Sequence, residues 1–353
     1  MRESRHRLLQ GDAADLSFLT DSSVALVVTS PPYPMIEMWD PLFRERVPGV
    51  PAALDAGDGL SAFSLMHDHL DLAWKEVHRV LIEGGWACIN IGDATRTLDG
   101  RFRLYPNHAR VLSACASLGF DVLPAVLWRK QTNAPNKFMG SGMLPAGAYV
   151  TLEHEHILLM RKGAKRKFTS SEERHARMQS AIFWEERNRW FSDIWDFKGA
   201  RQGLSSGGRD RSGAFPFELP FRLINMYSVR GDTVLDPFVG TGTTILAAMA
   251  NGRNSVGVDI DQEMFSTLKT GTEKMAEMLN GFLEERLADH RRFVEEYSRD
   301  KGNLPHRNRP HGFPVMTAQE EELTLEYIHQ VSLRDDGSVS VTYLGSPMTR
   351  RNS

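Results

Sequence analysis

The chain has 353 residues, 41% of them hydrophobic and 25% charged, a length that predicts two or three structural units. Its only cysteines, Cys88 and Cys115, both lie in apolar contexts, which excludes a disulfide-rich extracellular scaffold and a cysteine-ligated metal centre. The formal net charge is −3, and the chain lacks a signal peptide and any apolar run of the roughly 18 residues that a membrane helix needs, so we expect a cytoplasmic protein.

The first third of the chain alternates apolar runs with helical patterns, as a doubly wound α/β sheet with mostly parallel strands requires. The predicted strands are residues 8–9, 24–28, 86–91 and 122–128, and the predicted helices are residues 67–81 and 107–118. Gly84 and Gly85 are expected to end the first helix. Because the carboxyl ends of parallel strands meet at one edge, we expect a common rim to carry Asp12, Ser30, Asp93 and residues 129–131.

The strand predicted at residues 24–28 leads into Ser30-Pro31-Pro32-Tyr33, the candidate catalytic loop. Each proline fixes its φ angle and lacks an N–H group, so the loop presents acceptors without competing donors. Such a loop suits a planar base with an exocyclic amine. We expect acceptors at Ser30 and Pro31 to polarise the amine N–H bonds and the ring of Tyr33 to stack on the base.

Residues 34–62 form a long segment beside this loop and contain Met35, Met38, Trp39 and Phe43. Two interpretations stay open. The segment is either a lid that covers the substrate, or a surface helix that docks Trp39 and Phe43 on the core.

From Thr132 the periodicity breaks, and the next regular elements predicted are a strand at residues 157–160 and one polar helix at residues 172–189. Between residues 161 and 211 there are 13 Lys or Arg against 7 Asp or Glu, a local balance of +6 that favours a nucleic-acid surface. The candidate nucleic-acid contacts are Arg187, Arg189, Arg201 and Arg209. No metal site is predicted at residues 153–156, because neighbours on a strand point to opposite faces.

A second motif follows a predicted helix at residues 221–227 and a strand at residues 233–235. It reads Asp236-Pro237-Phe238-Val239-Gly240-Thr241-Gly242-Thr243-Thr244, a glycine-rich turn that lets the backbone approach a ligand before a helix begins near Thr243. Asp259 ends the next apolar run, 23 residues after Asp236, a spacing that suits the ribose hydroxyls of a nucleoside. The motif lacks the Gly-Lys-Ser/Thr of a triphosphate site. Beyond residue 261 we expect helices to residue 298, a linker at residues 303–314 and a terminal hairpin at residues 324–344.

Together, in this order and about 200 residues apart, the two motifs resemble the amino-group DNA methyltransferases that use S-adenosylmethionine, in the permuted β-class order with the catalytic loop first. The resemblance covers roughly residues 5–265. It implies a Rossmann-like class I methyltransferase fold, with a catalytic half at residues 1–131, an inserted target-recognition region at 132–211, a cofactor-binding half at 212–270 and a C-terminal extension at 271–353.

The resemblance also implies which residues bind the cofactor: Asp12, Asp236, Pro237, Phe238, Gly240, Gly242, Thr243, Thr244 and Asp259. Asp12 either contacts the adenine or closes a turn. The role of Asp93 is similarly open, between a cofactor contact and a structural capping role, and capping is favoured. Where the family usually has a His-Pro pair, this chain has Arg211-Ser212-Gly213, which leaves the cofactor contacts there undetermined.

The acceptor atom follows from the catalytic loop. No Pro-Cys pair is present, so methylation of cytosine carbon 5 is disfavoured and the acceptor is expected to be an amine nitrogen of a flipped base. In the family, serine at the first catalytic position goes with cytosine N4 more often than with adenine N6, which is the alternative. An RNA or protein-glutamine methyltransferase and a non-enzymatic DNA-binding protein are weaker alternatives. The expected partner is double-stranded DNA. The sequence leaves open the recognised site, a cognate restriction endonuclease, and whether the protein is a monomer or a homodimer.

Overall fold

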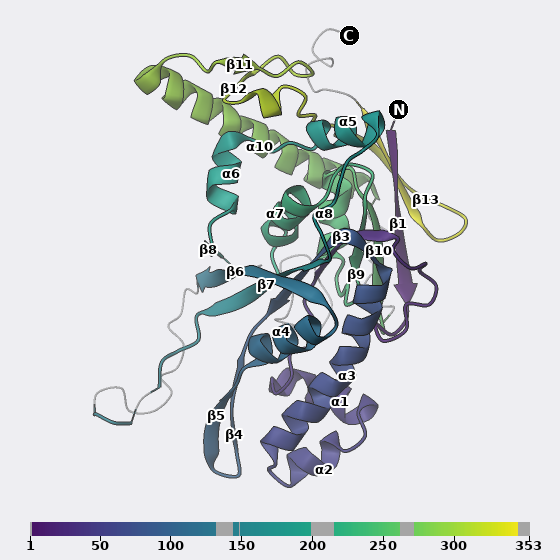
Figure 1. Cartoon of the computed structure of the whole chain (residues 1–353), viewed down its shortest axis with the longest axis vertical. Coiled ribbons are helices and arrows are strands. Elements are labelled where there is room, and N and C mark those ends of the chain that lie inside the picture. Colours follow the sequence, from purple (N-terminus) through teal and green to yellow (C-terminus); the bar gives the residue numbers. More distant parts are fainter. Residues whose placement is uncertain (1, 132–143, 148, 199–214, 262–271, 345–353) are drawn as a thin grey trace.

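A ten-stranded mixed sheet organises the computed structural model, which describes residues 2–131, 144–147, 149–198, 215–261 and 272–344 (Figure 1). The strand order is β13-β14-β1-β10-β9-β2-β3-β7-β6-β8. These strands are β1 (Arg2–Gln10), β2 (Val24–Thr29), β3 (Leu81–Ile91), β6 (Phe120–Gln131), β7 (His154–Lys162), β8 (Ile194–Lys198), β9 (Thr233–Asp236), β10 (Asn254–Asp259), β13 (Tyr327–Leu333) and β14 (Val339–Leu344).

The middle of the sheet is parallel. Strands β1, β10, β9, β2 and β3 pair in parallel, whereas β7 runs antiparallel between β3 and β6. All six residues of β2 are buried, as expected of a strand covered by helices on both faces. The fold is thus the predicted α/β class, and the strands expected in the first third of the chain are confirmed.

Helices cover both faces of the sheet. They are α1 (Asp40–Arg46), α2 (Val50–Asp55), α3 (Gly59–Val80), α4 (Asn107–Ser117), α5 (Ser171–Gln179), α6 (Trp184–Trp190), α7 (Glu218–Tyr227), α8 (Thr243–Ala250) and α10 (Thr272–Lys301). One core contains α3 and α4 with Leu158 and Met160 of β7, and the other contains α7 and α8 with Ile157 and Leu159. Alternate residues of one strand therefore serve opposite cores.

The first long helix begins earlier than predicted and ends within one residue of the predicted end. Asp58 caps the start of α3 by accepting a bond from the Ser61 backbone N–H (3.1 Å), and the helix ends at Val80. Gly84 and Gly85 lie inside β3 instead of ending the helix. A side chain at Gly84 would lie 2.4 Å from the Arg166 backbone nitrogen, so a close backbone approach, not a helix cap, requires this glycine.

The segment after the catalytic loop consists of a 3-10 helix at Glu37–Trp39 followed by α1 and α2. Phe43 is buried in the core, and Trp39 packs against the same cluster. The docked-helix interpretation therefore describes this structure, and covering of a bound base by the segment stays a prediction.

The prediction of a single polar helix at residues 172–189 is wrong, because these residues form two helices, α5 and α6. The reason is tertiary packing. Phe183, between the two helices, is fully buried and stacks on His290 of α10 at a ring distance of 3.9 Å. Glu186 of α6 receives two bonds from Arg286 of α10 (2.6 and 2.8 Å), which fixes the second helix against the C-terminal extension.

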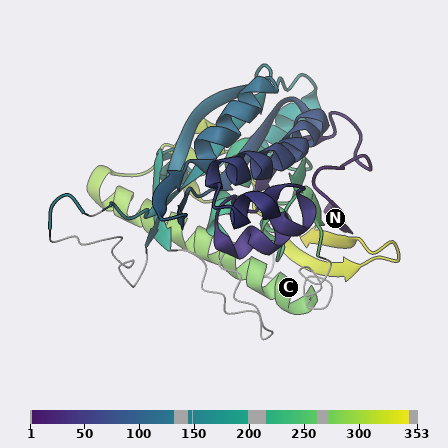
Figure 2. The ribbon, with the colours of Figure 1, turned by 90° about the horizontal axis from the view of Figure 1, so that it is seen from below.

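The described part of residues 132–211 shares the main sheet, since β7 lies in its interior and β8 at one edge. The boundaries predicted for the recognition region stay a prediction. At the other edge, the predicted C-terminal hairpin is confirmed: β14 pairs with β1, and β13 pairs with β14. Figure 2 shows α10 passing beneath the sheet near this hairpin.

The described residues also form two small hairpins, β4 (Ala94–Leu98) with β5 (Arg101–Tyr105) and β11 (His306–Arg307) with β12 (Pro314–Val315). None of the described helices combines the length and apolarity that a membrane span requires.

Candidate active site

The two sequence motifs meet at the carboxyl ends of neighbouring strands. Strands β2 and β9 pair in parallel, with Leu26 opposite Val234 and Val27 opposite Leu235. Beyond the paired residues, the Thr29 hydroxyl donates to the Asp236 carboxylate at 2.6 Å. The catalytic loop and the glycine-rich loop are therefore joined by a buried hydrogen bond, although about 200 residues separate them.

Asp236 braces the glycine-rich loop from inside the protein. Its carboxylate accepts from Thr29, from the Thr244 hydroxyl (2.6 Å) and from the Phe238 backbone N–H (3.1 Å). Burial raises the pKa of this carboxyl to about 6. The side chain is only 2% exposed, so it organises the loop and does not line its surface.

The glycine-rich turn depends on backbone shapes that glycine supplies. Gly240 and Gly242 have positive φ angles of 49° and 85°, and Gly242 forms the N-cap of α8. The turn is pinned by a bond from the Val239 N–H to the Val258 carbonyl (2.8 Å). Gly257 permits this approach, because a side chain there would lie 2.6 Å from the Val239 methyl group. A bare turn of this kind, followed by a helix N-terminus, fits the methionine portion of a bound nucleoside.

Asp259 lies at the rim of the same loop, at the end of β10. Its carboxylate accepts from the backbone N–H groups of Gly240 (2.8 Å) and Asp261 (3.0 Å). The side chain is half-buried, and four lone pairs on a carboxylate leave room for further donors. A role in binding ribose hydroxyls stays a prediction that this geometry fits.

Asp12 closes a turn, the second of its two predicted roles. One oxygen accepts from the Ala14 N–H (2.9 Å), and the other pairs with Arg46 at 2.7 Å.

The remaining predicted cofactor residues surround the glycine-rich turn. Pro237 and Thr244 are buried, whereas Phe238 and Thr243 are half-buried. Phe238 also makes an edge contact with Trp74, at a ring distance of 6.1 Å. The set therefore fits a nucleoside cofactor held by backbone and one aromatic ring, with Asp259 at its polar end.

The catalytic loop carries a polar network that its sequence did not reveal. Ser30 is half-buried, and its Oγ lies 2.9 Å from the Tyr33 Oη. The Tyr33 hydroxyl donates to Glu155 (3.0 Å), and the Asn90 amide donates to both Tyr33 (2.9 Å) and Glu155 (2.6 Å). Lys130 forms an ion pair with the same carboxylate.

The environment of Tyr33 differs from the one expected. The side chain is 9% exposed and belongs to a core cluster, and burial, followed by the charge of Glu155, raises the pKa of its hydroxyl well above the usual value. The phenol is therefore neutral at ordinary pH. Stacking of its ring on a base stays a prediction, whereas the hydroxyl has defined partners in this structure.

Sequence reasoning missed Asn90 and Glu155, although it placed Lys130 on the rim. Residues 153–156 were considered only for metal binding. The available signal was a carboxylate two residues before the apolar run 157–160 of β7, since a charge that enters a buried strand needs a partner.

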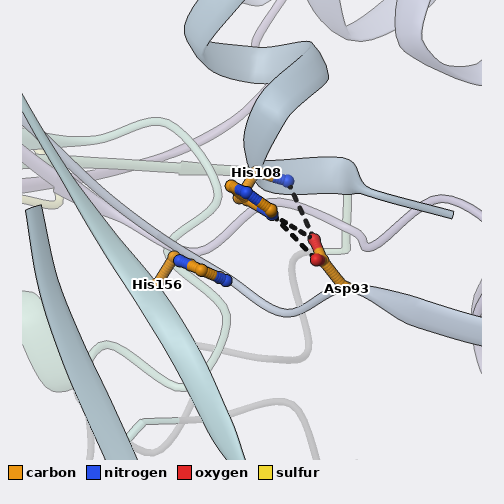
Figure 3. Close-up of side chains that lie close together, drawn as sticks. All are labelled: Asp93, His108 and His156. Atoms are coloured by element: carbon orange, nitrogen blue, oxygen red, sulfur yellow. Dashed lines mark hydrogen bonds and ion pairs between the residues drawn. The ribbon is translucent and has the colours of Figure 1, made fainter. Parts of the chain in front are cut away.

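Asp93, His108 and His156 form a second polar cluster beside this site (Figure 3). Asp93 accepts from the His108 backbone N–H (3.1 Å) and lies 2.8 Å from its ring nitrogen, so it caps the start of α4, the favoured role. His156 stacks on His108 with ring centroids 3.9 Å apart and planes inclined by 12°. Nearly parallel rings direct their nitrogen lone pairs side by side and not toward one ion. Burial lowers the pKa of His156 to about 4, so its ring is neutral.

Two of the four predicted DNA contacts lie within the described residues. Arg187 and Arg189 are exposed on α6, and Arg187 lies over the Phe191 ring at 5.8 Å. Arg201 and Arg209 lie outside the described residues.

Comparison with known proteins decides the family. A family model described as DNA methylase, covering the N6 and N4 methyltransferases, matches residues 24–270. The chain belongs to this family. The methylase is 48% identical over 328 residues to the type II methyltransferase M.MthZI of Methanothermobacter thermautotrophicus, an alignment that spans 92% of this chain and 91% of that relative. It is also 48% identical over 272 residues to M.MjaI of Methanocaldococcus jannaschii, spanning 74% and 89% of the two chains.

A solved structure agrees with this assignment. A DNA modification methylase of Thermus thermophilus, described as putative and crystallised with S-adenosyl-L-methionine, superposes with a TM-score of 0.59 at 34% identity, over 78% of the methylase and 97% of that chain. The predicted resemblance, fold class and cofactor, S-adenosylmethionine, are thereby confirmed.

Proposed function

We propose that this methylase transfers a methyl group from S-adenosylmethionine to the exocyclic N4 amine of a cytosine in duplex DNA. The observation that carries the proposal is the position of the Ser30 hydroxyl, which is half-buried at the sheet rim. Ser30 directly follows Thr29, whose hydrogen bond to Asp236 joins the catalytic and cofactor loops. Serine at this position goes with cytosine more often than with adenine in the resembled family. A paired amine is inaccessible inside a duplex, so the proposal includes flipping of the target base.

The proposed chemistry needs acceptors and positioning more than a nucleophile. The lone pair of a ring-conjugated amine is delocalised, and hydrogen bonds from its N–H groups to the Ser30 oxygen and the Pro31 carbonyl would return electron density to the nitrogen. When bound, S-adenosylmethionine supplies an electrophilic methyl group. The glycine-rich loop and Asp259 would hold it, and the Thr29–Asp236 bond fixes the distance between the two loops.

The cysteines support a nitrogen acceptor. Cys88 and Cys115 are fully buried in the two cores, and burial raises the pKa of both thiols, that of Cys115 to about 12. Neither thiol can attack a base at the rim, as methylation of a ring carbon would require.

A DNA-binding role for the basic segment belongs to the same proposal. Arg187 and Arg189 project from α6, which begins after the basic stretch that follows β7. We place the target-recognition region at residues 132–211, as the sequence predicts, with these two arginines contacting phosphates.

The decisive experiment identifies the methylated atom. Duplex DNA is incubated with the full-length protein and S-adenosylmethionine labelled in the methyl group, and the product is digested to nucleosides. The proposal expects the label in N4-methylcytosine, and it expects a Ser30→Ala variant, which lacks one of the two acceptors, to transfer the label on the order of 10²-fold more slowly. Label in N6-methyladenine would overturn the base assignment and leave the family assignment intact.

A further inference from the structure

Glu155 lies at the centre of a buried network that reaches the catalytic serine without touching it. One carboxylate oxygen accepts from Tyr33 (3.0 Å) and Asn90 (2.6 Å), and the other pairs with Lys130. We propose that Glu155 is a positioning residue that acts through Tyr33 to hold the Ser30 hydroxyl as a hydrogen-bond acceptor. The inference rests on the proposed function in one respect, that Ser30 receives the N–H of the target amine.

The direction of each hydrogen bond follows from counting hydrogens. A carboxylate can only accept, and Glu155 is a charged acceptor at 3.0 Å, whereas the Asn90 backbone carbonyl lies 3.5 Å from the Tyr33 hydroxyl, so the single hydrogen of that hydroxyl goes to Glu155. The same rule orients the Asn90 amide, whose NH₂ group, and not its oxygen, must face Glu155. That NH₂ group also donates to the Tyr33 oxygen (2.9 Å).

Tyr33 then has one way to bond to Ser30. Its hydrogen is committed to Glu155, so the 2.9 Å contact between the two hydroxyls must be a bond donated by Ser30. The Ser30 hydrogen is thereby directed toward Tyr33, and both lone pairs of the Ser30 oxygen are left for other donors. No other bond to the Ser30 hydroxyl occurs within the part of the chain that the structure describes.

The orientation matters because a hydroxyl is both a donor and an acceptor. A freely rotating Ser30 could donate its hydrogen to the amine nitrogen and occupy the lone pair that must attack the methyl group. Locked as an acceptor, it polarises the amine N–H bond and leaves that lone pair free. The surroundings preserve this state, since Tyr33, Asn90 and Glu155 are each at most 9% exposed and the charge of Lys130 balances the carboxylate.

The test replaces Glu155 by glutamine in the full-length protein. A glutamine amide in place of the carboxylate can donate to Tyr33, which allows the Tyr33 hydrogen to turn toward Ser30 and reverses the network. We expect kcat to fall on the order of 10²-fold. The KM values for DNA and S-adenosylmethionine, and the melting temperature, should change little. Glu153→Gln is the matched control, since that side chain is exposed and pairs with Arg129 on the surface (3.4 Å).

A double-variant cycle separates positioning from a general structural role. If Glu155 acts through the Tyr33 hydroxyl, then adding Glu155→Gln to a Tyr33→Phe protein should change kcat by less than about twofold. An equal loss in both backgrounds, or full activity of Glu155→Gln alone, overturns the inference. Nucleoside analysis of the same reactions keeps the two proposals apart. N4-methylcytosine made at normal speed by Glu155→Gln refutes only the role of Glu155, whereas a product other than N4-methylcytosine refutes only the base assignment.

Discussion

Replacing Asp236 by asparagine should change how the stability of the protein depends on pH. Burial raises the pKa of this carboxyl from 3.8 to about 6 in the folded state. A raised pKa means that the folded protein holds the proton more tightly than the unfolded chain does. The stability from this group is therefore fully present below about pH 3.8 and is lost as the pH rises through about 6.

The magnitude follows from the size of that shift. Two pKa units correspond to about 3 kcal/mol, of which about 2 kcal/mol is lost between roughly pH 4.5 and 7.5. Asparagine does not titrate, and its single oxygen can still accept from one of the two threonines while its NH₂ group faces the other, a loss that does not depend on pH. The unfolding free energy of Asp236→Asn, relative to the parent, should therefore rise by about 2 kcal/mol over this interval.

Urea denaturation of both proteins at several pH values measures this difference directly. Other titrating groups contribute equally to the two proteins and cancel. A stability difference that is independent of pH would refute the reasoning, because it would mean that Asp236 is ionised as easily in the folded protein as in the unfolded chain. A difference that falls with rising pH would show that the bonds from Thr29 and Thr244 outweigh the effect of burial.

Three further predictions concern ligands. Asp259→Ala should weaken S-adenosylmethionine binding by about 1.5–3 kcal/mol and leave DNA affinity nearly unchanged; equal cofactor affinity by calorimetry would contradict the ribose role. Gly257→Ala should also weaken cofactor binding, since the new methyl group would lie 2.6 Å from Val239 and displace the loop; a variant with parental affinity would show that Val239 can yield. Arg187→Ala with Arg189→Ala should lower the slope of log affinity for DNA against log salt by roughly 0.9 per lost phosphate contact. An unchanged slope would place the DNA elsewhere.

The meeting of Ser30 and Asp236 at one rim was predictable. Both follow short apolar runs, and buried parallel strands align their carboxyl ends whatever their separation along the chain. The glycine-rich turn was predictable for a similar local reason, since Gly240 and Gly242 adopt φ angles that other residues avoid.

The partners of these residues were not predictable, because they depend on long-range pairing. Glu155 reaches Tyr33 only because β7 inserts antiparallel between β3 and β6, an arrangement that the local pattern of residues 154–162 does not encode. The break between α5 and α6 has the same origin. Phe183 interrupts the predicted helix because its ring packs against α10, which lies about 100 residues further along the chain.

The C-terminal hairpin gives the sheet a protected margin. Without β14, the backbone N–H and C=O groups of β1 would lack partners along one side. An unpaired edge strand of this kind can pair with a strand of another chain. The outermost strand is instead β13, which is interrupted by a bulge between Ile328 and Gln330 and backed by α10. Although remote from the methyl-transfer chemistry, the tail thus covers a strand that would otherwise be open to pairing with other chains.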